Sequence, residues 1–287
     1  MKKIIITLSG VLITGLVFSQ TVSPAEISPA AKIKLNNGQK IVVENIITIE
    51  ASLGMGMELT SDSTSVNALE VKNSTDKNYT ISNTLTKLKV NMNMMGQPTN
   101  YDSEKKEDNN AEIAKTFEDK LNKPVDIIID NTSGLAIMVD KKVKKKDTDE
   151  ENPMDGLLNM FAESTDDAVV TGAFALIPRG KRIEDSWSDT AKAKDMQTIR
   201  TYTLKSITGN EALIQLGAIT IAVNKIDMQG MEIEFKSNTK TAGEIITDIS
   251  TGLIKKKNST SDITGSFQLM GQDMPISAKT ISTTIYK

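Results

Sequence analysis

The chain contains no cysteine and no histidine among its 287 residues. Without cysteine there is no disulfide framework and no thiol chemistry, so buried apolar surface has to supply the stability. Without either residue, Ser-His-Asp and Cys-His nucleophile systems and His- or Cys-based zinc sites are excluded. The sequence therefore favours a protein that is not an enzyme. We assign no catalytic, cofactor-binding or metal-binding residue and expect no cofactor.

Aromatic residues make up only 4% of the chain and include a single Trp. A glycoside hydrolase needs paired carboxylates framed by aromatic residues that stack on sugars, so this scarcity argues against that class. Proline is also scarce, with 7 residues, whereas Thr, Ser, Ile and Val are frequent. This composition favours long strands, and the predicted fold class is mainly β with a few helices.

Long apolar runs are absent except at the N-terminus. Met1-Lys2-Lys3, the apolar stretch Ile4–Phe18 and the small residue Ser19 predict a signal peptide over residues 1–19. No other segment is long and apolar enough to span a membrane, and there is no cysteine to carry a lipid anchor. We expect an exported chain, periplasmic or secreted, with no transmembrane span in its mature form.

The charge balance is mildly acidic. The net charge is −3, and it becomes −5 when Lys2 and Lys3 are removed with the signal peptide. This argues against nucleic acid as a partner. A run of Lys residues leading into acidic residues predicts a charged linker over residues 141–153.

The chain nearly repeats itself. Asp130-Asn131-Thr132-Ser133-Gly134-Leu135 returns as Asp248-Ile249-Ser250-Thr251-Gly252-Leu253, and Val71–Val90 matches Leu204–Val223 at a constant offset. The duplication predicts one large, internally duplicated antiparallel sheet. The hexapeptides are interpreted as turns, in which Asp accepts backbone N–H groups and Gly takes a left-handed conformation. Neither copy has the acidic spacing of a calcium loop.

The predicted organisation has five parts. A flexible leader over residues 20–31 follows the signal peptide. Residues 32–140 form a first β-rich repeat with a helix inserted at Ala111–Leu121, and residues 154–287, after the linker, form a helix (Met154–Ser164) and a second repeat. Alternation and turn residues predict these strands: Lys32–Leu35, Gln39–Leu53, Glu58–Ser65, Leu69–Ser74, Tyr79–Asn93, Thr99–Ser103, the hairpin Val125–Asp140, Ala168–Ile177, Lys181–Thr190, Gln197–Ile207, Glu211–Val223, Met231–Ser237, Gly243–Thr247, Leu253–Asn258, Ile263–Met270 and Pro275–Tyr286.

Several turn motifs carry a family resemblance. The Asn37-Gly38-Gln39 turn, the Met-Gly-Gln hairpins at Met95 and Met270, and Asp185-Ser186-Trp187 resemble a domain-of-unknown-function family of exported envelope proteins from Gram-negative bacteria, chiefly Bacteroidetes. The resemblance covers roughly residues 32–287 and implies a large antiparallel sheet. By analogy, that sheet would be a curved half-barrel like the periplasmic lipoprotein carriers. The family leads us to expect Gly before Asp185, where this chain has Glu184.

Two other motifs invite chemical readings. Ser237-Asn238-Thr239-Lys240 fits the S-x-x-K pattern of serine acyl-enzymes, but its Ser ends a strand-like run instead of opening a helix. Fourteen Met residues cluster around Met55–Met57, Met92–Met95, Met228–Met231 and Met270–Met274. Thioethers at M-x-M spacing share one strand face and suit Cu(I), whereas Met also fills irregular gaps in cores or lines adaptable apolar surfaces.

Three functional hypotheses remain open. The first is a non-enzymatic envelope protein that binds a hydrophobic ligand or a lipid-linked partner in a concavity lined by Met, Ile and Leu. The second is a structural or interaction module that pairs with another envelope protein through an edge strand. The third is a Met-based Cu(I)-binding protein.

Overall fold

Among the described residues, the named elements of this computed structural model are twelve strands and the short helix α3 (Asp166–Thr171). It describes residues 29–30, 32–54, 56–105, 114, 117, 120–139, 166–193, 195–228, 231–269 and 272–287. The strands are β1 (Lys40–Ser52), β2 (Glu58–Ser74), β3 (Asn78–Met94), β4 (Gln97–Asp102), β5 (Val125–Asp130), β6 (Ala136–Val139), β7 (Ser186–Ala193), β8 (Met196–Thr208), β9 (Glu211–Met228), β10 (Met231–Asp248), β11 (Ile254–Leu269) and β12 (Gln272–Tyr286).

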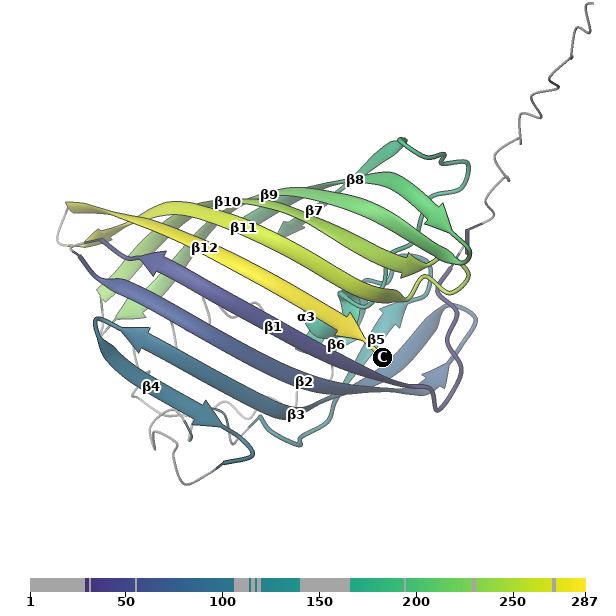
Figure 1. Ribbon diagram of the computed structural model, residues 1–287, viewed down its shortest axis with the longest axis horizontal. Coiled ribbons are helices and arrows are strands. Elements are labelled where there is room, and N and C mark those ends of the chain that lie inside the picture. Colours follow the sequence, from purple (N-terminus) through teal and green to yellow (C-terminus); the bar gives the residue numbers. More distant parts are fainter. Residues whose placement is uncertain are drawn as a thin grey trace, which may run out of the picture.

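All twelve strands belong to one antiparallel sheet in the order β6-β5-β3-β2-β1-β12-β11-β10-β9-β8-β7, with β4 also paired to β3. The sheet is strongly curved, and α3 lies inside the curve (Figure 1). Among the described strands the sheet is open, because its path begins at β6 and ends at β7. The two halves share this sheet since β1 pairs with β12 from Val43↔Tyr286 to Ser52↔Ser277. The predicted large antiparallel sheet, curved and open, is confirmed.

The strands differ from the sequence predictions mainly in length. Predicted pairs of short strands are single long ones in β2, β10 and β11. In β2 the buried Asn67 interrupts the apolar alternation beside a bulge, yet the backbone ladder continues past it. Cross-strand hydrogen bonding needs only backbone groups, so polar stretches that look like breaks in the sequence remain paired.

Two predicted strands are wrong. Ala168–Ile177 was expected to be a strand, but its first part belongs to α3, whose first turn carries Asp166 and Asp167, where acidic side chains favour a helix N-terminus. Phe174 alone keeps an isolated bridge, to Leu253. Lys32–Leu35 is an extended segment outside the named strands.

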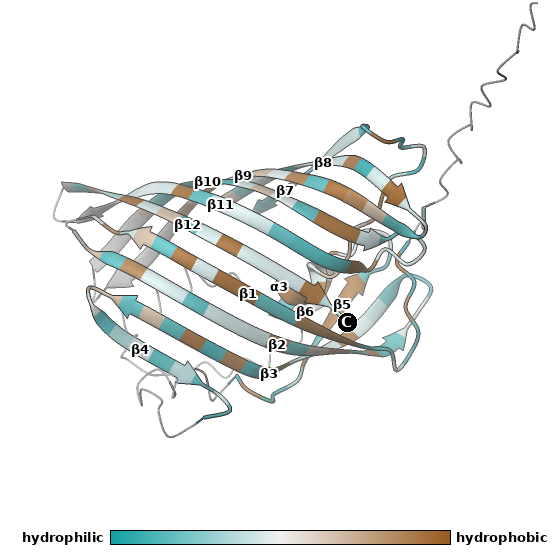
Figure 2. Cartoon of the chain, in the orientation of Figure 1, coloured by the Kyte–Doolittle hydropathy of each residue, from teal (hydrophilic) through white to brown (hydrophobic). Residues whose placement is uncertain are grey.

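The two faces of the sheet are distinct. We call the face that packs against α3 the inner face and the opposite one the outer face. A first apolar cluster joins the inner face to α3 and is built around these almost fully buried residues: Ile33, Leu69, Val71, Ile81, Ile127, Ile129, Val170, Leu204 and Ile214. Figure 2 shows hydrophobic bands alternating with pale and hydrophilic ones along β1 and β3.

A second apolar cluster lies toward the other end of the same strands. Its buried members are Ile49, Ala51, Leu53, Leu59, Val90, Met92, Tyr101, Phe235, Ile276 and Ala278. Ala114, Phe117 and Leu121 from the predicted inserted helix pack against it, and the described positions 114 and 117 are helical. The Tyr101 and Phe117 rings lie 5.3 Å apart at a tilt of 47°. The insertion therefore contributes to this second cluster.

The sequence duplication is visible in the strand register. Asp130 pairs with Asn78, and Asp248 pairs with Glu211, which are matched positions in the two copies. A bulge after Val71 in β2 recurs after Leu204 in β8, again at matched positions. Each copy thus places the same hairpin and the same irregularity at the same point of the sheet.

A second bulge breaks this equivalence. Its extra residue is Thr86 on β3, opposite Val66 and Asn67 of β2, and the pairing of β8 with β9 has no corresponding bulge. One extra residue turns the following side chains to the other face. Leu88 therefore packs against the second cluster, whereas its sequence match Ile221 lies on the outer face, 57% exposed.

Glycines permit close packing between the curved strands β10 and β11. A Cβ at Gly243 would lie 2.3 Å from the Asn258 carbonyl oxygen, and one at Gly265 would lie 2.4 Å from that of Lys236. Backbone atoms cannot withdraw as a flexible side chain can. These positions therefore exclude any side chain while the present curvature is kept.

Candidate functional site

The middle of the inner face is polar. Residues paired in register with the buried inner-face residues form a band between the two apolar clusters, which we call the hydroxyl belt: Asn45, Ser61, Ser63, Ser65, Thr198, Thr220, Thr239, Thr241, Ser259, Ser261, Thr280, Ser282 and Thr284. All of these except the buried Ser61 are half-buried, so solvent reaches them. The belt runs across seven strands and gives the inner face a surface able to form hydrogen bonds.

Hydrogen bonds between neighbouring strands organise the belt. The hydroxyls of Thr241 and Ser261 lie 2.8 Å apart, and those of Thr198 and Thr220 lie 2.9 Å apart. A hydroxyl has one donor and two acceptor positions, so a paired Ser or Thr keeps capacity for a further partner. The belt is therefore ordered by its own bonds without using all of its hydrogen-bonding capacity.

Asn45 lies on β1, toward the β2 end of the belt. Its side-chain oxygen accepts hydrogen bonds from Ser282, at 3.2 Å, and from Thr284, at 3.0 Å. Neither bond uses the two donors of its amide nitrogen. An acceptor brought to the inner face would find an oriented donor here.

Apolar side chains border the belt on the second-cluster side. Ile47, Met57, Leu88, Met94 and Ile263 are only partly buried and pack against the second cluster. Ile47 stands directly opposite two belt residues, Ser63 on β2 and Ser282 on β12. The inner face thus presents an apolar area and a hydroxyl area side by side.

An aromatic and charged group lies at the β7–β8 end of the inner face. Trp187 stacks on Tyr202 with ring centroids 5.5 Å apart and planes 18° from parallel. Asp189 accepts a 2.7 Å bond from Arg200 Nε and a 3.2 Å bond from the Tyr202 hydroxyl. Burial raises the pKa of Tyr202 to about 12, so its hydroxyl remains a donor at neutral pH.

The first-cluster end of the inner face is closed by α3 and the following chain. Tyr286 donates a 2.7 Å hydrogen bond to the Gly172 carbonyl, and burial raises its pKa. Asn83, fully buried on β3, accepts a 2.9 Å bond from Asn67 and donates a 3.0 Å bond to Asp166 at the start of α3. These bonds hold α3 against the sheet.

The N-terminal segment holds the two repeated turns together. Ala30 N donates to Ile249 O in the second turn, and Ile33 N donates to Asn131 O in the first, at 2.9 and 2.7 Å. Lys34 N then donates to Thr251 O in the second turn at 3.0 Å. The part of the predicted leader at residues 29–30 is therefore buried and fixed instead of flexible.

The repeated hexapeptides are turns, as predicted. Asp130 Oδ1 accepts bonds from the N–H and hydroxyl groups of Thr132 and Ser133, and Asp248 Oδ1 accepts the corresponding four bonds from Ser250 and Thr251. The side-chain bond from Thr132 and the related bonds lower the pKa of Asp130. Desolvation raises the pKa of Asp248, but its hydrogen bonds outweigh that effect and lower it.

The turn before Trp187 has the backbone conformation that glycine favours. Glu184 has a φ of 73°, in the left-handed region that glycine favours. Its carboxylate lies 2.6 Å from Lys205 Nζ. A left-handed backbone conformation is therefore present where Gly was expected, and Glu184 occupies it.

The S-x-x-K motif cannot work as a catalytic pair. Ser237 and Lys240 lie in the middle of β10 with an odd number of steps between them, so their side chains point to opposite faces. Met57, Met92 and Met94 belong to the second cluster, where Met92 is 4% exposed. The side chains of Met228, Met231 and Met270 lie outside the described ones, as do the predicted linker and the helix at 154–164.

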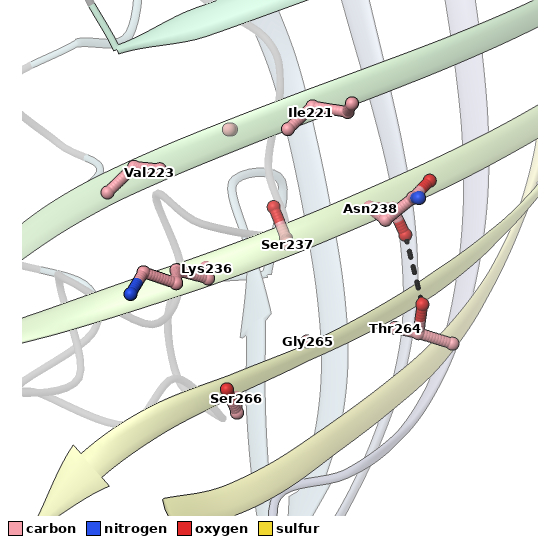
Figure 3. A pocket seen from close by; sticks show the side chains of 9 residues that line it. Ile221, Val223, Lys236, Ser237, Asn238, Thr264, Gly265 and Ser266 are labelled. Atoms are coloured by element: carbon pink, nitrogen blue, oxygen red, sulfur yellow. Dashed lines mark hydrogen bonds between the residues drawn. The ribbon is translucent and has the colours of Figure 1, made fainter.

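Two hollows of about 340 and 360 Å³ occur in the described part of the sheet. Figure 3 shows the first, where Ile221, Asn238 and Thr264 follow one another across β9, β10 and β11. The second lies between Lys40, Glu70 and Thr84 and their neighbours. Neither matches the predicted concavity lined by Met, Ile and Leu.

Within the described residues, no group of three or more carboxylates is placed to hold a metal ion. No helix in the same part of the chain has the length and apolarity needed to span a membrane.

Residues 76–254 match the model of DUF6263, a family of unknown function. The chain belongs to the DUF6263 family. This confirms the predicted membership of a domain-of-unknown-function family, while its export and envelope location remain predictions. No curated protein sequence matches the chain.

Several solved structures match the chain with TM-scores below 0.5. One is described as showing lipid–protein interactions in lipovitellin and has a TM-score of 0.48 and 11% identity. The match covers 88% of this chain and 25% of the lipovitellin chain. The β domain of the Bordetella autotransporter BrkA has a TM-score of 0.26 and 6% identity, covering 86% and 98% of the two chains. Pseudomonas aeruginosa OccK5 (OpdH) has a TM-score of 0.23 and 7% identity, covering 88% and 99%. The DUF6263 chain thus spans a quarter of the lipovitellin chain.

Proposed function

We propose that this DUF6263 protein is an exported, non-enzymatic binding protein that holds an amphiphilic molecule on the inner face of its sheet. The observation that carries the proposal is the inner face itself. Partly buried apolar side chains such as Ile47 and Leu88 adjoin a half-buried hydroxyl belt. Apolar area removed from water drives the binding of an alkyl chain, and the belt supplies bonds for its polar end.

This proposal narrows the hydrophobic-ligand hypothesis. A purely apolar ligand would cover the belt and leave its donors and acceptors without water, which is unfavourable for each group that loses its partner. An amphiphile avoids that loss because its polar end replaces the water. The lack of His and Cys supports a binding role over a catalytic one.

The test compares adjacent residues on opposite faces of one strand. Ile47 points inward and is half-buried, whereas Ile46 points outward and is 43% exposed. Ile47→Thr should weaken the binding of decyl maltoside by about five- to tenfold, since a buried methylene contributes about 0.8 kcal/mol. Ile46→Thr removes the same groups from the outer face and should leave affinity unchanged.

Isothermal titration of the full chain with decyl maltoside below its micelle concentration measures this difference. Equal affinities for the two variants would place the alkyl chain elsewhere and contradict the proposal. Urea unfolding of both variants shows whether any loss of binding follows from loss of folded protein.

A further inference from the structure

The charges of the inner face indicate what kind of polar group it accepts. Of the inward-pointing strand residues with described side chains, three are charged: Asp189, Arg200 and Lys257. Asp189 and Arg200 form an ion pair with each other, at 2.7 Å. Lys257 also takes part in a polar or ionic interaction. The charges of Asp189 and Arg200, the two charged residues at the β7–β8 end, therefore compensate each other.

Hydrogen-bonding groups, in contrast, are abundant and aligned. One row of the register runs from Asp189 on β7 through Arg200, Ala218, Thr241 and Ser261 to Thr280 on β12, and five of its six positions carry a polar side chain. The row crosses five strand spacings, about 24 Å at roughly 4.8 Å each. It is long enough for an extended polar chain, beyond the reach of a single small group.

Asp189 and Arg200, at the charged end of this row, together offer several hydrogen-bonding groups to one ligand. Arg200 uses Nε for Asp189, and the described residues offer no bond to its other guanidinium nitrogens, while its side chain is 34% exposed. Asp189 is held from both sides by Arg200 and Tyr202. A planar donor group fixed beside a carboxylate can bind neighbouring hydroxyls of one ligand at the same time.

An aromatic surface adjoins the row. Trp187 and Tyr202 occupy the next inward-facing positions along β7 and β8, and both are half-buried. Their stacked rings give a flat, apolar surface beside the hydroxyls and the guanidinium group. Flat aromatic surfaces next to fixed polar groups suit ring-shaped molecules that have both apolar C–H faces and hydroxyl edges.

We propose that the polar part of the ligand is an uncharged, hydroxyl-bearing saccharide chain, bound along the row from Asp189 to Thr280 beside Trp187. This rests on the proposed binding of an amphiphile to the inner face. A glycolipid head and a free oligosaccharide share this chemistry, and the probes below separate them.

The experiment uses three probes with the same alkyl chain: decyl maltoside, sodium decyl sulfate and decyltrimethylammonium bromide, each below its micelle concentration. Maltotetraose is the probe without an alkyl chain. Trp187 is the only Trp of the chain, so its fluorescence reports on this place alone, and calorimetry gives the affinity. Decyl maltoside should bind at least about tenfold more tightly than either charged probe.

A pair of double variants locates the polar group. Thr241→Val with Ser261→Ala removes both partners of a 2.8 Å hydroxyl pair from the row, which changes stability little because no partner is left unpaired. Ser186→Ala with Thr203→Val removes another 2.8 Å hydroxyl pair, on the outer face. The first should weaken decyl maltoside binding about fivefold or more without weakening decyl sulfate binding, and the second should change neither.

Each outcome decides between the two proposals. Equal affinity for the three decyl probes, or no effect of the inner-face double variant, would overturn the saccharide inference and leave the amphiphile proposal standing. Maltotetraose binding as tightly as decyl maltoside would support the saccharide chemistry with a free sugar as its source and overturn the role of the alkyl chain. Absence of binding by all four probes would overturn both.

Discussion

Replacing Asn83 by Ala tests how the closed end of the sheet is held. Asn83 is 0% exposed and links Asn67, 5% exposed, to Asp166 on α3. A buried donor left without its partner costs about 1–3 kcal/mol, and a hydrogen bond to a carboxylate contributes about 1.5–3 kcal/mol. Asp166 is exposed, so in the variant a water molecule can donate to its carboxylate in place of Asn83, which offsets part of the lost hydrogen-bond energy. We expect Asn83→Ala to lower the free energy of unfolding by about 3 kcal/mol.

Urea unfolding followed by circular dichroism measures this change, and an m-value near 3 kcal/mol/M would convert it to a midpoint shift of roughly 1 M. Asn258→Ala is the control, because Asn258 accepts one bond from Thr283 in a half-buried position and should cost less than about 1 kcal/mol. In a double-mutant cycle, Asn67 and Asn83 should be coupled by about 1 kcal/mol. A loss below about 1 kcal/mol for Asn83→Ala would refute the idea that this chain of bonds secures α3.

Two further predictions follow from backbone geometry and turn chemistry. Gly265→Ala should lower the melting temperature through a loss of at least about 2 kcal/mol, because its Cβ would meet Lys236 O, whereas Gly217→Ala, with nothing within 4 Å, should be tolerated. Asp130→Asn with Asp248→Asn should cost about 1 kcal/mol at neutral pH, as each turn loses a charged acceptor. Since the pKa of each carboxyl is lowered by folding, this stability is present above the unfolded value near 3.8 and is lost as pH falls through the folded value. Unfolding curves from pH 7 to pH 3 should therefore converge for the wild-type chain and the variant.

The fold was predictable where local chemistry repeats. The hexapeptides at Asp130 and Asp248 predicted equivalent turns, and the alternation around them predicted the strands that they connect. The strand prediction for Ala168–Ile177 was wrong because Val169 and Val170 suit either a strand or a buried helix. The helix forms because Val170 packs against strands that are remote in sequence, and this packing is not visible in the local pattern.

The candidate site was not predicted. Its signal was present in the sequence as hydroxyl residues at every second position, Ser61-x-Ser63-x-Ser65 and Ser259-x-Ser261. Such alternation does not reveal which face of a strand is buried, and a solvated outer face would look the same. Only the register, which places these residues beside Ile47 and between the two clusters, gives the belt its position.

The duplication and the site are related through a single bulge. Up to that bulge the two halves supply matched buried residues, Val71 with Leu204 and Ile81 with Ile214, and these form the first cluster. Beyond it, the first half turns Leu88 inward, and the second half turns the matching Ile221 outward and leaves the inner face of β9 to Ala218, Thr220 and Ala222. An exact copy would have put apolar residues on the inner face of both halves. The added residue, Thr86 on β3, instead gives one apolar side and one hydroxyl side, which is the arrangement that an amphiphile requires.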